Sequence, residues 1–326
     1  MLLRLFRSGH VFQLILIPLV GILLWTKALL SPDSYPFFAG EDAMPLFAPV
    51  FNYLHQSVFL SKLITLILFL SIIIYILRIN YKYGFIKEHT HLPGILFILI
   101  TAGFDKLFNF HPVYFAALLL LISFEQMFDS YTNSSLSKAF NSSFFLAIAS
   151  LFYFPVIFLF PVIIIGFFTL QKTIGWRNYV LTLLGVALPW IYCFAAYFST
   201  QRFQYLIDTI SQNIHTSNIV IFKDLHIQIF LGYLIFLTIL SSFVIISHYE
   251  EKRISSRKYF KVFFLLFVCS VALLVILPSV SREMAVIFAI PLSYLIANYF
   301  LCIRHPLWGE LLFTILIGLV VFLQLT

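Results

Sequence analysis

The stretch LITLILFLSIIIYIL, residues 63–77, decides the fold class of this chain. It contains no charged residue, and its apolar side chains stand at consecutive positions rather than at alternate ones. A membrane-spanning β-strand alternates apolar and polar positions, whereas a membrane-spanning helix needs about 20 mostly apolar residues. Similar apolar runs recur from one end of the sequence to the other. The sequence therefore predicts an all-α integral membrane protein with many spans.

The composition excludes a soluble protein. Hydrophobic residues make up 62% of the chain and charged residues only 10%, whereas a soluble domain carries roughly 25% charged residues. No segment between the apolar runs is long enough to fold alone, so we expect one polytopic membrane domain over residues 1–326. The net charge of +7 does not indicate a nucleic-acid partner, because most basic residues fall in short loops, where they set membrane orientation.

The apolar runs predict about eleven transmembrane helices. The first is too long for the core of a signal peptide and is followed by no cleavage motif, so we expect it to be retained. The expected spans are 11–30, 59–78, 92–105, 112–127, 140–154, 156–171, 178–198, 226–247, 261–278, 284–303 and 308–325.

Residues 140–171 allow two interpretations, because Pro155 and Pro161 interrupt one long apolar run. The run could form a single kinked helix or a hairpin of two short helices. The hairpin is favoured, since a single span would move the basic segment 250–261 to the outer side of the membrane.

Lysine and arginine gather on one side of the predicted bundle. With the N-terminus inside, the inner loops hold fourteen of the twenty basic residues and the outer side holds six. Basic residues are enriched in cytoplasmic loops. We therefore expect a multi-pass protein of the inner (cytoplasmic) membrane with its N-terminus in the cytoplasm, and the loop at 31–58 then faces outward.

This first outer loop is acidic and carries Asp33, Glu41 and Asp42 without any lysine or arginine. The apolar residues that follow recur at spacings of three and four, which predicts an amphipathic helix lying on the outer membrane surface. Two roles stay open for the carboxylates. They could cap that helix and solvate the loop, or they could act as a general base or metal ligand at the membrane surface. The apolar stripe consists of Ala43, Leu46, Phe47, Val50, Phe51 and Leu54.

Three outer basic residues, Arg282, Arg202 and Lys106, are candidates for binding a lipid phosphate. The alternative for each is a snorkelling anchor or an ion-pair partner. Glu125 and Asp129 share one helical face at the inner end of a span. We expect them to pair with a cation such as Lys138 or to cap a helix, because a proton path needs more intramembrane charges than the sequence has.

No motif in the sequence identifies a cofactor. The nine histidines form no HExxH or similar cluster, and there is no Walker A, G-x-S-x-G or dinucleotide-binding loop. The three cysteines lie inside apolar runs and indicate no disulfide or metal spacing. A divalent metal at the acidic loop is the one cofactor hypothesis left open.

The outer acidic loop with GEDAMPLF at 40–47, the surface helix after it and the proline-broken SLFYFPVIFLFP at 150–161 together resemble the GT-C superfamily of membrane glycosyltransferases. The resemblance covers roughly residues 1–200; the C-terminal helices over 226–326 lie outside it. It implies a polyprenyl-phosphate-linked sugar donor used at the periplasmic face. Glu41, Asp42 or Asp33 would then activate the acceptor or hold a metal, and the three basic residues would stabilise the phosphate leaving group.

The chain also resembles a family of Bacteroidota inner-membrane proteins with no established activity, through GWRNYVLTLLGVALPW at 175–190 and IPLSYLIANYFLCIRHPLWGELLF at 290–313. Three functions are therefore carried forward. The first is a GT-C-like transferase acting on a lipid phosphate. The second is a non-catalytic membrane subunit that binds other proteins of an envelope assembly, and the third is a lipid or small-molecule transporter.

Overall fold

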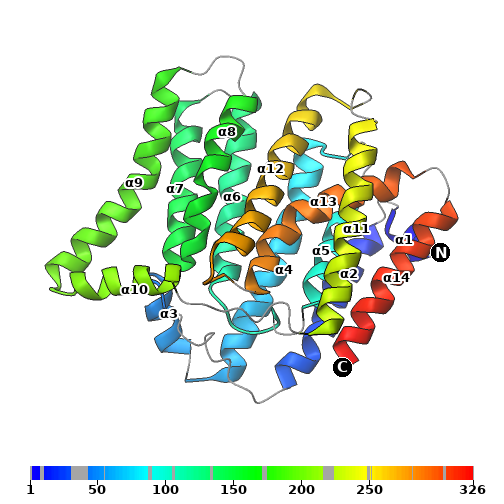
Figure 1. Ribbon diagram of the computed structural model, residues 1–326, viewed down its shortest axis with the longest axis horizontal. Helices are drawn as coiled ribbons and strands as arrows, with labels where there is room; N and C mark the ends of the chain where they lie inside the picture. The colour runs from blue at the N-terminus through cyan, green and yellow to red at the C-terminus, as the bar shows by residue number, and fades with distance from the viewer. Residues whose placement is uncertain are drawn as a thin grey trace.

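A computed structural model describes residues 2–7, 11–30, 43–54, 56–86, 90–104, 107–132, 135–170, 175–215, 224–247, 250, 252–280, 282–303 and 306–325. In these ranges the regular elements are all helical (Figure 1). They are α1 (Leu2–Arg7), α2 (Val11–Leu30), α3 (Phe47–Leu54), α4 (Val58–Tyr83), α5 (Leu92–Ala102), α6 (Val113–Thr132), α7 (Leu136–Phe152), η2 (Phe154–Leu159), α8 (Phe160–Leu170), α9 (Trp176–Ser199), α10 (Phe203–His215), α11 (Leu225–Ser247), α12 (Ile254–Ile276), η3 (Arg282–Met284), α13 (Ala285–Cys302) and α14 (Pro306–Leu325).

Eight helices in the described part of the chain are long and apolar enough to cross a membrane. They are α2, α4, α6, α9, α11, α12, α13 together with η3, and α14. The predicted all-α fold is confirmed for the described residues, and the long apolar helices indicate a multi-pass membrane protein. Three further segments are apolar but shorter, namely α5, α7, and η2 with α8.

α13 forms the centre of the bundle. Its residues from Ala285 to Leu301 are all buried, and it crosses the bundle obliquely (Figure 1). α5 packs against it and is buried along its whole length. A helix of 11 residues is about 17 Å long, shorter than the roughly 30 Å hydrocarbon core of a bilayer. α5 is therefore covered by other helices rather than by lipid.

Hydrogen bonds join several helix ends at one end of the bundle, called here the α3 end. Lys27 of α2 donates to the Gln324 carbonyl of α14 over 2.7 Å, and the Gln324 side chain donates to the Ala102 carbonyl of α5 over 2.6 Å. Lys62 of α4 donates to the Ala28 carbonyl of α2 over 2.8 Å. Carbonyls at helix C-termini attract cations, so Lys27 and Lys62 cap helix ends.

The opposite end gathers the other helix ends. Lys82 near the end of α4 and Lys138 near the start of α7 both pair with Asp129 of α6. Ser256 at the start of α12 donates to the carbonyl of Gly84, which ends α4. These four helices therefore meet at the end of the bundle away from α3.

The segment at 140–171 is a hairpin. α7 ends at Phe152, and the 3-10 helix η2, with Pro155 in its first turn, separates it from α8. Lys258 of α12 donates to the Leu170 carbonyl at the end of α8 over 2.9 Å. The start of α7 and the end of α8 thus lie at the same end of the bundle, as the charge distribution predicted.

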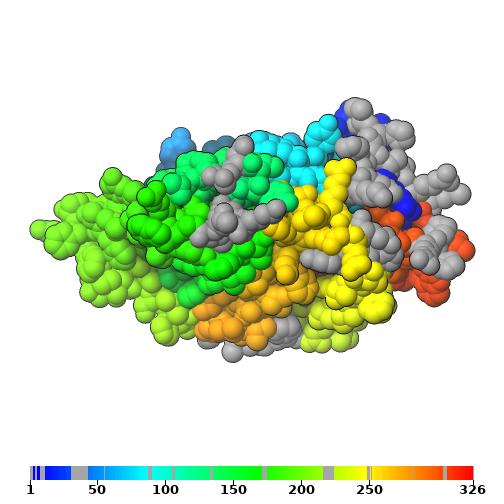
Figure 2. All heavy atoms as spheres, turned by 90° about the horizontal axis from the view of Figure 1, so that it is seen from above, coloured from blue at the N-terminus to red at the C-terminus, as the bar shows by residue number. Residues whose placement is uncertain are grey.

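α9 and α10 form an arm that extends from the bundle. Both Figure 1 and the view from above in Figure 2 show this light-green arm at the left. α9 packs on α7 through Gly185, where an added Cβ would lie 2.2 Å from the Ser143 Oγ atom and 2.6 Å from the Phe140 carbonyl oxygen. Small residues at helix interfaces allow such close approach in membranes.

Candidate functional site

The predicted surface helix is present as α3. Phe47 and Leu54 are buried on its inner side, and the Leu46 amide donates to the Leu151 carbonyl near the end of α7 over 3.2 Å. The Phe47 ring packs 5.1 Å from that of Phe110, centroid to centroid. Leu46, although part of the predicted stripe, is exposed. The three candidate carboxylates, Asp33, Glu41 and Asp42, lie outside the described residues.

Arg282 is the best-placed of the predicted phosphate-binding residues. Its side chain is only 3% exposed, and its Nη2 atom lies 2.6 Å from the Asp224 Oδ2 atom. Asp224 is 55% exposed, so the ion pair reaches from the protein interior to the surface. This contact corresponds to the ion-pair alternative drawn from the sequence. It also leaves a guanidinium, which has five N–H donors, close to an accessible position.

Of the other two basic candidates, Arg202 lies within the described residues and is joined to Arg282 by no contact there. Arg202 is exposed at the turn between α9 and α10, where its amide donates to the Tyr197 carbonyl. The preceding residue, Gln201, has a positive φ of 56°, which makes this turn sharp. Lys106 lies outside the described residues.

Further polar side chains are buried beside Arg282, and we call the group the α3-end cluster. The Tyr153 hydroxyl at the end of α7 donates to the Glu283 Oε1 atom over 3.1 Å. The His111 ring stands edge-on to that of Tyr153, 5.7 Å away. The cluster consists of His111, Tyr153, Asp224, Arg282 and Glu283.

His111 is held neutral in this cluster. Its Nδ1 atom accepts a hydrogen bond from the Val113 amide over 3.1 Å, which places the proton of the neutral ring on Nε2. Burial lowers the pKa of His111 to about 4, against the opposing effect of the Glu283 carboxylate. At neutral pH the cluster therefore contains a neutral imidazole beside ionisable groups, an arrangement typical of functional sites.

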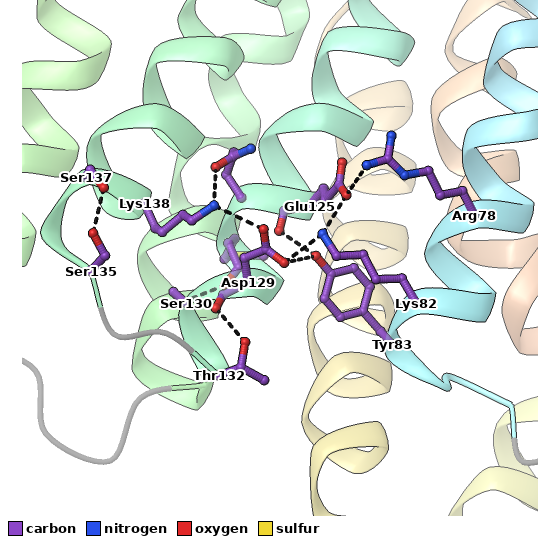
Figure 3. Close-up of polar contacts among 12 residues, drawn as sticks. Arg78, Lys82, Tyr83, Glu125, Asp129, Ser130, Thr132, Ser135, Ser137 and Lys138 are labelled. Atoms are coloured by element: carbon purple, nitrogen blue, oxygen red, sulfur yellow. Dashed lines mark hydrogen bonds and ion pairs between the residues drawn. The ribbon is translucent and has the colours of Figure 1, made fainter.

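Glu125 and Asp129 belong to an ionic network at the opposite end (Figure 3). The Glu125 Oε1 atom lies 3.1 Å from Arg78 Nη2 and 2.8 Å from Lys82 Nζ. The two oxygens of Asp129 lie 2.9 Å from Lys82 Nζ and 3.0 Å from Lys138 Nζ. The predicted pairing with Lys138 is confirmed for Asp129. Three cations face two carboxylates, so the network tethers α4, α6 and α7.

Residues 42–326 match the family described as "Family of unknown function (DUF6427)". The chain belongs to this family. Comparison with curated proteins and with solved structures finds no match. The DUF6427 match includes Asp42, Lys106, Arg202 and Arg282 and begins after Asp33 and Glu41. The family description names neither an organism nor an activity, so the GT-C resemblance stays a prediction.

The described residues of this DUF6427 chain contain no group of three or more His, Cys, Asp or Glu side chains that could hold a metal ion. Cys193, Cys269 and Cys302 form no disulfide among these residues. The metal hypothesis concerned Asp33, Glu41 and Asp42, which lie outside these residues.

Sequence reasoning missed several members of the α3-end cluster. Glu283 follows Arg282 directly, and His111 and Tyr153 border predicted spans. A hydropathy pattern does not show which polar side chains at span ends meet, and the pairing of Arg282 with Asp224 joins residues 58 positions apart. A signal was present in the sequence, because adjacent charges at the mouth of an otherwise apolar helix are costly to bury without partners.

Proposed function

We propose that this DUF6427 protein is a membrane transferase of the GT-C type that acts on a lipid-linked phosphate at the outer membrane face. The observation that carries the proposal is the α3-end cluster, where a buried arginine is joined to an accessible aspartate. The start of α3 is anchored next to the residues of this cluster, because the Leu46 amide donates to the Leu151 carbonyl of α7 and the Phe47 ring packs on Phe110. The chain that follows the acidic loop is thus held near Arg282.

The same proposal assigns eleven membrane crossings, with the N-terminus in the cytoplasm and the α3 end outside. The helix ends that meet at the α3 end and at the opposite end alternate along the chain, in support of this topology. The short helices α5, α7 and α8 then cross within the bundle. A location in the inner membrane follows from the charge bias.

In the proposed reaction an acceptor oxygen attacks the anomeric carbon of the sugar. The bond from that carbon to the phosphate oxygen breaks, and the lipid phosphate leaves with the bonding electrons. Arg282 would stabilise the negative charge that develops on the phosphate, the kind of electrostatic term that dominates such displacements. Glu41, Asp42 or Asp33 would accept the proton of the acceptor.

The first test measures phosphate binding directly. Polyprenyl phosphate, added to the purified protein in nanodiscs, is expected to raise its unfolding temperature, because a ligand that binds the folded state stabilises it. Arg282→Lys keeps the charge but loses the guanidinium fork and is expected to weaken binding about tenfold. Arg177→Gln, at the exposed start of α9, is the control and should leave binding unchanged.

The second test is made in cells. The double variant Glu41→Gln and Asp42→Asn removes two carboxylates from the outer loop while preserving side-chain size. Surface glycans or glycoproteins should be lost at a normal level of the protein. Unchanged glycans in this variant, together with no binding of polyprenyl phosphate by the wild type, would refute the proposal.

A further inference from the structure

A second site lies at the opposite end of the bundle, where a cavity of about 480 Å³ opens between the ends of α4 and α13 and the starts of α5 and α12. Its wall is apolar in part, with Leu77, Phe85 and Leu301. Phe85 follows Gly84, whose positive φ of 56° lets α4 end in a tight turn. The Phe85 ring then stacks on that of Phe263, with the ring centroids 4.8 Å apart.

Two asparagines line the cavity with unsatisfied polar atoms. Asn80 is 5% exposed and Asn298 is 3% exposed. Asn80 donates through Nδ2 to the Thr90 carbonyl over 3.1 Å, and Asn298 accepts at Oδ1 from Lys252 over 2.6 Å. The Asn80 Oδ1 acceptor and the Asn298 Nδ2 donor have no partner among the described residues. Buried polar atoms left unpaired are costly and therefore indicate a missing ligand or water.

The described lining of the cavity is positively charged. Its ionisable side chains include Lys82, Lys252 and Arg253 but no carboxylate. Lys82 is already neutralised by the Glu125 network, whereas Lys252 contacts the Asn298 amide and lies 3.9 Å from the Phe260 ring centroid. Neither contact neutralises the ammonium. The donors of Lys252, Arg253 and Asn298 thus face the cavity, and no described lining residue supplies an anion for them.

We infer that this cavity binds a phosphate ester that also carries a hydroxyl group, such as a glycerol phosphate. The phosphate oxygens would accept from Lys252, Arg253 and Asn298, since phosphate offers several acceptors to converging cations. The hydroxyl would donate to the Asn80 Oδ1 atom, which a phosphodiester alone cannot satisfy. The volume suits a headgroup, and the exposed Tyr81 on the lining marks a side open to the surroundings.

This inference does not rest on the proposed transferase, because the two sites share no residue. The test uses the full-length chain, delipidated and held in neutral detergent. Short-chain phosphatidylglycerol is expected to bind more tightly than phosphatidylmethanol, which lacks the hydroxyls, and phosphatidylcholine should bind least. Free glycerol 3-phosphate forms a separate arm. Binding of that compound assigns the site to a soluble ester, and binding of the lipid alone assigns it to a membrane headgroup.

Asn298→Asp is the decisive variant. Its carboxylate keeps the contact to Lys252 and so preserves folding, but it supplies the anion internally and should weaken phosphatidylglycerol binding about tenfold or more. Asn80→Ala should abolish the preference for phosphatidylglycerol over phosphatidylmethanol. Lys258→Gln lowers the net charge by one unit, as Asn298→Asp does, but it lies outside the cavity lining. It should leave phosphatidylglycerol binding unchanged. Equal binding by wild type and Asn298→Asp, or by phosphatidylglycerol and phosphatidylcholine, overturns the inference.

Discussion

At the scale of single residues, Glu125 is the most constrained charge in the ionic network. Its side chain is 6% exposed and faces both Arg78 and Lys82. Replacing Glu125 with Gln removes the carboxylate that Arg78 faces and leaves Lys82 paired with Asp129 alone. We expect a loss of about 2 kcal/mol in unfolding free energy, since both cations keep some access to water. Thermal unfolding in detergent measures the effect. Glu250→Gln, at an exposed position, is the charge-matched control, and an equal loss in both variants would contradict the prediction.

The buried position of Lys252 predicts that ligand binding in the cavity depends on pH. Burial lowers the pKa of Lys252 from its usual 10.5 to about 8, against a raising effect from Cys302. Binding of phosphatidylglycerol, whose single phosphodiester charge is constant, should therefore weaken as the pH rises through 8. His91 does not interfere, because burial lowers its pKa below 6.5. Between pH 8 and 10.5 the unfolded chain holds more protons, so the stability contribution of Lys252 rises as binding falls.

The control for this profile is Lys252→Arg. Its guanidinium stays protonated throughout the window, so the variant should bind with little change from pH 7 to 9.5. Arg253, the other cavity cation, stays charged in both proteins. A parallel loss of binding in wild type and Lys252→Arg would show that another group titrates.

Individual residues were predictable from the sequence only where their partners are local. Glu125 and Asp129 are one helical turn apart, and Lys138 follows closely in the chain, so the pairing of Asp129 with Lys138 could be foreseen. The contacts of Glu125 with α4 could not, because they depend on how two helices pack. The same limit applies to Arg282 and Asp224 and to the asparagines of the cavity, which come from α4 and α13.

At the scale of helices, Gly185 decides how closely α9 approaches α7. Gly185→Ala would place a methyl group 2.2 Å from Ser143 Oγ and 2.6 Å from the Phe140 carbonyl, so the helices must separate. We expect a loss of about 2 kcal/mol in stability. The control is Gly232→Ala in α11, where an added Cβ would meet no atom of a neighbouring residue within 4 Å. This variant should be neutral or slightly stabilising.

A double variant separates the two clashes. Adding Ser143→Gly to Gly185→Ala removes the hydroxyl but not the Phe140 carbonyl, so about half of the lost stability should return. The measurement is a double-mutant cycle on the midpoint of thermal unfolding. No recovery at all would mean that the backbone contact alone sets the spacing of the helices.

α3 offers a second test at this scale. Phe47 is fully buried against Phe51, Phe110 and Phe115, and Phe47→Ala should cost about 3 kcal/mol in the local stability of the helix. Hydrogen exchange over residues 43–54 should then become faster while the rest of the bundle is unchanged. Tyr53→Ala is the control, because this side chain on the same helix is 76% exposed. Unchanged exchange in Phe47→Ala would mean that other contacts hold α3.

Helix positions were predictable, but several helix ends were not. The expected span at 59–78 continues to Tyr83, and the one expected to begin at 261 begins at Ile254. Apolar runs stop where charges appear, whereas the backbone hydrogen bonds of a helix continue past them. Lys82 and Lys258 lie on these extensions and make the contacts that join the helices. Hydropathy therefore locates the part of each helix in lipid and misses the part that carries the charges.

At the scale of the whole molecule, the open question is whether α7 and α8 each count as a crossing. With eleven crossings, residues 135 and 253 lie on the same side of the membrane, and residue 201 lies on the other. If α7, η2 and α8 made one crossing, residues 135 and 253 would lie on opposite sides. The positive-inside distribution and the hairpin shape both favour the first arrangement.

Cysteine labelling distinguishes these topologies. Cys193, Cys269 and Cys302 are first replaced by serine, and single cysteines are introduced as Ser135→Cys, Gln201→Cys and Arg253→Cys. A membrane-impermeant maleimide applied to intact spheroplasts should label only Gln201→Cys, because the eleven-crossing topology places the turn between α9 and α10 on the outer side. The other two should react only after the membrane is permeabilised. Labelling of Arg253→Cys in intact spheroplasts would contradict the eleven-crossing topology and would mean that α7, η2 and α8 make a single crossing. The phosphate-ester cavity would then lie on the outer face.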